Sequence, residues 1–102
     1  MDIVLSKNNI PIRLTEERWL HIITGHPEMA VYYEEILVTV AEPDTIYAGS
    51  RDDLIAVSRQ LIGTNKHIVV AYKEINDDGF IITAYVSSKI NSLQKRAIIW
   101  KL

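Results

Sequence analysis

Apolar residues recur at helical spacing along the first part of the chain, up to Pro43. The pattern predicts a first helix with Thr15 as its N-cap, because a threonine hydroxyl there can accept a hydrogen bond from a backbone N–H of the first turn. Gly25 and Pro27 end this helix. A second helix is predicted over Glu28–Val40, and it ends where Pro43 restricts the residue before it.

After Pro43 the pattern changes to β-branched and alternating residues, which are typical of strands. The predicted strands are Thr45–Ala48, Leu54–Leu61, His67–Ile75 and Phe80–Ser87. Turn residues separate them, and Asn76–Gly79 predicts a hairpin because Gly79 can adopt a positive φ at little cost. Short turns between successive strands favour antiparallel pairing. Ala97–Lys101 is either a further edge strand or a tail.

The expected fold is therefore α+β, with two N-terminal helices packed on one face of a four- or five-stranded antiparallel sheet. The length of 102 residues predicts a single domain over residues 1 to 102. Hydrophobic residues make up 48% and charged residues 24%, which is the composition of a globular domain and not of a disordered chain. The sequence contains no cysteine, which excludes disulfides, thiolate nucleophiles and cysteine-ligated metal sites.

Charge is distributed unevenly along the chain. Residues 1 to 78 contain all 13 acidic residues and seven basic ones, whereas residues 79 to 102 contain four basic residues and no acid. The net charge of -2 argues against non-specific coating of nucleic acid. The basic C-terminal end fits one phosphate-facing surface, and it fits solvated lysines equally well. Neither a signal peptide nor a membrane span is expected from the apolar pattern, so the expected location is the cytoplasm.

The strand Phe80–Ser87 carries hydroxyl groups on one face. A period of two places Phe80, Ile82, Ala84 and Val86 beneath the helices. The other face then presents Ile81, Thr83, Tyr85 and Ser87. A bulge after the NDDG turn would instead exchange the faces of Tyr72 and Lys73 relative to Thr83. Hydroxyl groups on the face of Thr83 can donate to phosphate oxygens, and an aromatic ring can stack on a base. The alternative is a half-solvated sheet face built from good strand formers.

Two histidines near the end of the first helix are candidates for proton transfer. On a helical wheel His26 falls near the apolar stripe, while His21 points to the polar side. Histidine titrates near neutral pH, so either could act as an acid or a base, or could serve only a structural role such as capping the helix end. Their spacing of five is not that of a helical metal pair, and no metal site is expected.

The cations nearest the predicted strands and turns are Arg51, Arg59, Lys73 and Lys89. Paired guanidinium donors match the charge that spreads over phosphate oxygens during phosphoryl transfer. Each of these side chains could equally be an ordinary solvated charge. Arg59 is expected in the middle of a strand, on its apolar side, where it would need a partner or a cleft.

Five short motifs follow one another along the chain: RLTEERWLHIITGHPEM, a helix ending in AEPDTI, IVVAYKEI, an NDDG turn and FIITAYVSSK. Their order and spacing resemble the phage-associated branch of the barnase–EndoU–colicin–RelE superfamily of nucleases. The matched region extends from about Arg13 to Trp100. The resemblance implies a RelE- or barnase-like α+β fold. It also implies a metal-independent ribonuclease of toxin or phage-element type, without a cofactor, that cleaves RNA by attack of a ribose 2′-hydroxyl on the adjacent phosphorus.

The resemblance also implies which residues form the site. The residues that match the catalytic positions of the family are His26, His21, Thr83 and Tyr85. A positively charged strand residue commonly completes such a site, and either Arg59 or Lys73 could fill that place. Apart from the resemblance, Ser87, Lys89 and Arg51 are further candidate substrate-binding residues. One histidine, preferably His26, would transfer protons, while Thr83 and Tyr85 would bind or orient the phosphate.

The partners that the resemblance implies are RNA, such as tRNA or ribosome-bound mRNA, and a protein antitoxin or immunity partner. A membrane is not expected as a partner. Two other hypotheses stand beside the nuclease. One is a non-catalytic module that binds RNA or protein through the same sheet. The other is a structural subunit that dimerises through an exposed strand edge such as Ala97–Trp100.

Overall fold

The structure is a computed structural model that describes all 102 residues. Its helices are α1 (Glu16–Gly25), η1 (Pro27–Val31, 3₁₀), α2 (Tyr33–Ala41) and η2 (Leu93–Lys95, 3₁₀). Its strands are β1 (Asp2–Leu5), β2 (Pro11–Leu14), β3 (Thr45–Ala48), β4 (Leu54–Val57), β5 (His67–Ile75), β6 (Asp78–Ser87) and β7 (Ile98–Lys101). No helix is long and apolar enough to cross a bilayer.

The seven strands form one mixed sheet in the order β1-β2-β6-β5-β4-β3-β7. Four neighbouring pairs from β6 to β7 are antiparallel, and the hairpin β1–β2 is antiparallel as well, but β2 runs parallel to β6. The expected sheet of four or five antiparallel strands is therefore wrong. The N-terminal hairpin has strands of only four residues, too short for a clear alternation. The long chain between β2 and β6 allows them to pair in parallel.

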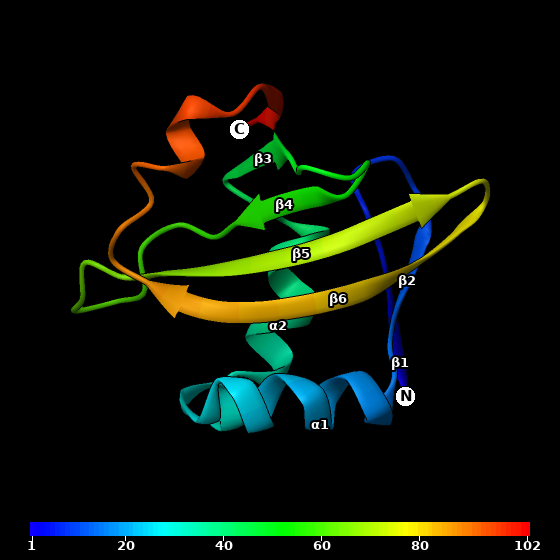
Figure 1. The fold of residues 1–102 in the computed structure, drawn as a ribbon, viewed down its shortest axis with the longest axis horizontal. Helices are drawn as coiled ribbons and strands as arrows, with labels where there is room; N and C mark the ends of the chain where they lie inside the picture. The colour runs from blue at the N-terminus through cyan, green and yellow to red at the C-terminus, as the bar shows by residue number, and fades with distance from the viewer.

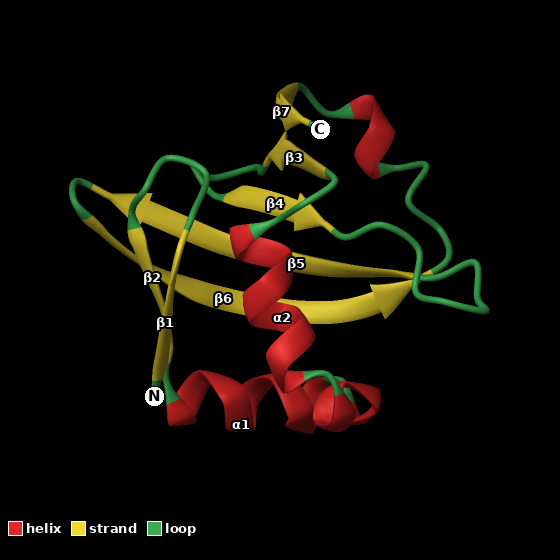
Figure 2. Cartoon of the chain, turned by 180° about the vertical axis from the view of Figure 1, so that it is seen from behind, coloured by secondary structure: helices red, strands yellow, loops and turns green.

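α2 crosses one face of the sheet, and α1 runs alongside β6 (Figures 1 and 2). Thr15 is the N-cap of α1, as predicted, and its hydroxyl accepts a hydrogen bond from the Arg18 N–H at 3.1 Å. The single second helix predicted over Glu28–Val40 is wrong. Pro27 begins the short η1, and Tyr32 has a non-helical backbone (φ −116°, ψ 23°), so a new helix begins at residue 33.

The predicted strands Thr45–Ala48 and His67–Ile75 are confirmed as β3 and β5. The prediction Leu54–Leu61 is too long, because β4 ends at Val57. At Ser58 the regular pairing ends: its N–H still bonds to the Ile68 carbonyl at 2.9 Å, but the Ile68 N–H bonds to the Ser58 hydroxyl at 2.8 Å instead of to its carbonyl. The C-terminal segment left open as strand or tail is the edge strand β7, paired with β3.

A bulge in β6 changes the predicted faces of that strand. Ala71 of β5 lies opposite Thr83, whereas the next residue, Tyr72, lies opposite Ile81, so Ile82 is the extra residue. Ile81 is fully buried on the helix side, where a polar-side position was predicted. Phe80 lies opposite Lys73 on the other face, which we call the open face. The prediction that Phe80 and Ile82 lie beneath the helices is therefore wrong.

The hairpin between β5 and β6 forms as predicted, but Gly79 does not make its turn. Ile75 pairs with Asp78, and the positive φ of the turn (57°) belongs to Asn76. Gly79 lies within β6, where a Cβ atom would clash with the Lys73 carbonyl oxygen and would lie 2.6 Å from Cδ1 of Ile12. Glycine is required here by the close approach of neighbouring strands.

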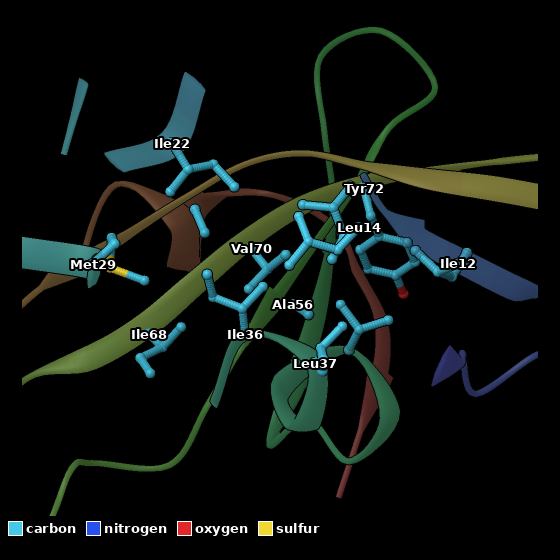
Figure 3. Packing of buried hydrophobic residues seen from close by; sticks show 13 residues of the cluster. Ile12, Leu14, Ile22, Met29, Ile36, Leu37, Ala56, Ile68, Val70 and Tyr72 are labelled. Carbon is cyan, nitrogen blue, oxygen red and sulfur yellow. The ribbon is translucent and has the colours of Figure 1, made fainter. Parts of the chain in front are cut away.

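The main core fills the space between the sheet and the helices. It has 13 buried residues, among them Ile22 of α1, Met29 of η1 and Ile36 of α2, packed on the helix face of the sheet (Figure 3). A second cluster of five buried residues lies on the open face: Tyr47, Ile55, Val57, Val69 and Leu93. Leu93 comes from η2, so the C-terminal segment is held against one half of the open face.

Candidate functional site

His26 and Tyr85 meet at an edge of β6 where no further strand pairs and along which α1 runs. β2 pairs with β6 only at Gly79 and Phe80, so no strand lies beside the rest of that edge. α1 runs along β6 and ends near the C-terminal end of that strand (Figure 1). The His26 N–H bonds to the Ile22 carbonyl at 2.7 Å, which ends α1, and Pro27 then begins η1. The centroids of the His26 and Tyr85 rings lie 5.7 Å apart, with the planes tilted by 35°.

The imidazole of His26 remains accessible to a ligand. Its side chain is 41% exposed, and its Nδ1 lies 3.8 Å from Oε2 of Glu28. A ligand can therefore reach the ring, and imidazole is the side chain that most often transfers protons in catalysis.

Tyr85 remains a phenol at neutral pH. Its ring is half-buried and packs against the cluster on the open face, opposite Val69 in the register. Burial raises the pKa of Tyr85 above its usual value of 10, and the positive charge of Arg96 partly opposes this rise. The side chain can therefore donate a hydrogen bond. Thr83 lies on the same face of β6, opposite Ala71.

Arg96 was not among the predicted site residues. It follows η2, and the buried Leu93 anchors that helix on the open face. One Arg96 nitrogen approaches the Ala48 carbonyl at 3.4 Å, and no acidic group lies within ion-pair distance of its guanidinium. The signal that could have found Arg96 is the excess of basic residues after residue 78.

Lys73 and Arg51 lie together at the other end of the open face. They line a pocket of about 360 Å³ whose other residues are Ser50, Asp53, Phe80 and Ile82. Lys73 is two positions along β5 from Ala71, which faces Thr83. These two predicted cations are thus on the sheet face of Thr83 and Tyr85, though in a separate hollow.

Of the remaining predicted residues, Arg59, His21 and Lys89 do not lie on this face, whereas Ser87 does, opposite His67 in the register. Arg59 is exposed in the β4–β5 loop and not in a strand, and it lines pockets beside α2. His21 is exposed on α1. The Ser87 hydroxyl accepts from the Lys89 N–H at 3.0 Å and so stabilises the turn after β6. Lys89 itself is exposed in that turn.

The structure contains no cluster of metal-ligating side chains. No group of three or more His, Cys, Asp or Glu side chains lies close enough to hold an ion. The third histidine, His67, has its Nδ1 2.7 Å from the Ser58 carbonyl and thereby fixes the start of β5. The arrangement at His26, Tyr85, Thr83 and Arg96 combines one proton-transfer group, two hydroxyl donors and one cation.

Comparison with known proteins gave no match: no family model, curated protein or solved structure was found to be similar to this chain.

Proposed function

We propose that this protein is a metal-independent ribonuclease that acts at the junction of His26 and Tyr85. The observation that carries the proposal is the approach of these two rings where no strand pairs with β6, with the positive charge of Arg96 acting on the same tyrosine. Transesterification at RNA requires a base, an acid and donors for the phosphate oxygens. The residues around Tyr85 supply each of these groups.

His26 would take the proton from the ribose 2′-hydroxyl as its oxygen attacks phosphorus. Tyr85, protonated at neutral pH, would give its proton to the leaving 5′-oxygen, and the imidazolium of His26 would then return a proton to the phenolate. Thr83 and Arg96 would donate to the non-bridging phosphate oxygens, on which negative charge develops. The products would be a 2′,3′-cyclic phosphate and a 5′-hydroxyl end, with no net gain or loss of protons by the enzyme.

A cleavage assay with purified protein and a defined single-stranded RNA, in the presence of a chelator, tests this proposal. The wild type is expected to produce 5′-hydroxyl ends, and His26→Ala is expected to lower the rate by about 10²- to 10⁴-fold, the usual contribution of an acid–base group. His21→Ala is the matched histidine variant on the same helix, with a much smaller expected loss. Intact RNA with the wild type, or equal losses in the two variants, contradicts the proposal.

A non-catalytic module that binds RNA through the same face is the second candidate. It is favoured by one observation: none of the four surface pockets is lined by His26, Thr83 or Tyr85. Its signature would be RNA binding without cleavage by the wild type. If the nuclease is active in cells, we propose that a protein antitoxin or immunity partner restrains it, because uncontrolled RNA cleavage would harm the cell that makes it.

A further inference from the structure

A row of side chains crosses the open face at the far end from Tyr85. Ile3 of β1 pairs with Arg13 of β2, Arg13 pairs with Phe80 of β6, and Phe80 pairs with Lys73 of β5. Paired residues on neighbouring strands point to the same face of a sheet. The row therefore places an aromatic ring between two cations. Phe80 is the only phenylalanine of the chain, and 37% of its surface is exposed to solvent.

The bulge in β6 adds an aliphatic side chain beside this ring. It places Ile82 on the same face as Phe80, and the two residues line the pocket of about 360 Å³ together with Lys73 and Arg51. A regular strand would have directed Ile82 and Phe80 toward the helices. The pocket is thus lined by two apolar side chains and two cations.

Two acidic side chains near these cations have partners of their own, although Asp53 also lines the pocket. Oδ1 of Asp53 accepts the Arg51 N–H at 2.9 Å, and Asp78 forms an ion pair with Arg13. Lys73 and the Arg51 guanidinium have no acidic group within ion-pair distance. Two unpaired cations beside an exposed ring complement a ligand that carries both a flat base and a phosphate.

We propose that this pocket binds a nucleotide of single-stranded RNA, with its base stacked on Phe80 and Ile82 and its phosphate held by Lys73 and Arg51. The inference rests on the proposed function, since it identifies the pocket as a subsite for RNA that also reaches Tyr85. Positions 80 and 85 lie on one strand face, opposite Lys73 and Val69, which are four residues apart along β5 and so about 13 Å apart at about 3.3 Å per residue. At the ~3.4 Å rise of stacked nucleotides this distance corresponds to about four of them.

Binding of an uncleavable RNA tests the subsite without requiring catalysis. The probe is a fluorescently labelled 2′-O-methyl octanucleotide, which has no free 2′-hydroxyl, and the readout is anisotropy at several salt concentrations. Phe80→Ala is expected to weaken binding about 5- to 150-fold, the usual effect of losing one base–aromatic stack. Phe80→Trp retains a stacking surface and is expected to keep most of the affinity.

The role of the two cations is tested by the salt dependence of binding. Each of Lys73→Gln and Arg51→Gln is expected to lower the slope of log affinity against log salt by about 0.7, the value for one lost phosphate contact with a single strand. Lys66→Gln in the exposed β4–β5 loop and Ile62→Ala at its fully exposed apolar tip are the matched controls, with unchanged binding. Circular dichroism of each variant verifies that the fold is retained.

The outcomes separate this inference from the proposed function. If the wild type cleaves RNA but Phe80→Ala and Lys73→Gln bind the octanucleotide as the wild type does, the subsite is wrong and the nuclease stands. If the wild type does not cleave but these variants lose affinity as expected, the subsite stands and the nuclease is wrong. Failure of the wild type to bind the octanucleotide at all overturns the subsite; a protein that bound this face in a Phe80-dependent way would then be the occupant instead.

Discussion

Tyr33 and Tyr85 differ in the charges that surround them. Burial raises the pKa of Tyr33 to about 12, and the rise is increased by a 2.7 Å hydrogen bond from its hydroxyl to the carboxylate of Asp2 and by nearby glutamates. At Tyr85 burial also raises the pKa, but the positive charge of Arg96 acts in the opposite direction. Tyr33 thus links the first turn of α2 to β1, whereas Tyr85 stands beside the one arginine of the C-terminal segment.

Tyr33 is expected to make folding stability depend on pH in the alkaline range. Its pKa in the folded protein exceeds the value of 10 for an exposed tyrosine, so its contribution is fully present below pH 10 and is lost as the pH rises toward about 12. Tyr33→Phe should therefore make the free energy of unfolding fall less steeply over that range. Urea denaturation of both proteins at stepwise pH measures the difference, and parallel curves would contradict the assignment.

At the scale of elements, β6 combines features that depend on its neighbours. The bulge at Ile82 changes the face of its first residues, and Gly79 allows β2 and β5 to approach it closely. Periodicity alone predicted a regular strand from Phe80 with Gly79 in the turn. Both errors have one cause. The residues of a strand do not show how it is aligned with its partner strand, and that alignment decides where an extra residue is accommodated.

Gly79→Ala should destabilise the sheet where β2, β6 and β5 meet. The new Cβ would clash with the Lys73 carbonyl oxygen and with Ile12, so we expect a loss of about 1–3 kcal/mol, as for other overpacked positions. Gly25→Ala is the matched control, because a Cβ there has no neighbour within 4 Å and alanine is the better helix former. Chemical denaturation of the two variants measures both; equal stabilities would contradict the close approach at Gly79.

At the scale of the whole molecule, the two ends of the chain complete the sheet. The hairpin β1–β2 extends one side and β7 the other, and Nζ of Lys7 lies 4.8 Å from the ring centroid of Trp100, which brings the two terminal regions into contact. The basic C-terminal segment is held on the open face by Leu93. One residue of this basic segment, Arg96, thus comes close enough to Tyr85 for its positive charge to act on the pKa of that tyrosine.

Leu93→Ala should release this segment. The side chain is 7% exposed and packs with the open-face cluster, so its removal is expected to cost about 2–5 kcal/mol of local stability. Hydrogen exchange should become faster for residues 88 to 97 and for β3 and β4, while α1 and α2, which pack on the other face, stay protected. If exchange increases equally throughout the chain, the segment is not an independent unit.

In the candidate site, too, the sequence predicted some of the residues, while others depend on contacts between distant parts of the chain. The resemblance pointed to His26, Thr83 and Tyr85. In the structure His26 lies beside Tyr85, and Thr83 lies on the same face of β6 as Tyr85. The catalytic roles of these three residues stay predictions. Arg59 was selected because its strand was predicted too long. Arg96 was overlooked because its neighbour Tyr85 is reached through the packing of Leu93 on the sheet, which no local pattern shows.

The sequence by itself determined the features that depend on a few consecutive residues. The N-cap at Thr15 and the limits of β3 and β5 are of this kind, since capping hydrogen bonds, turn residues and β-branched runs act over short distances. Only the tertiary structure decided the parallel pairing of β2 with β6, the bulge at Ile82 and the meeting of His26 with Tyr85. These depend on the free energy of contacts between residues far apart in the chain, which close packing and strand register select together.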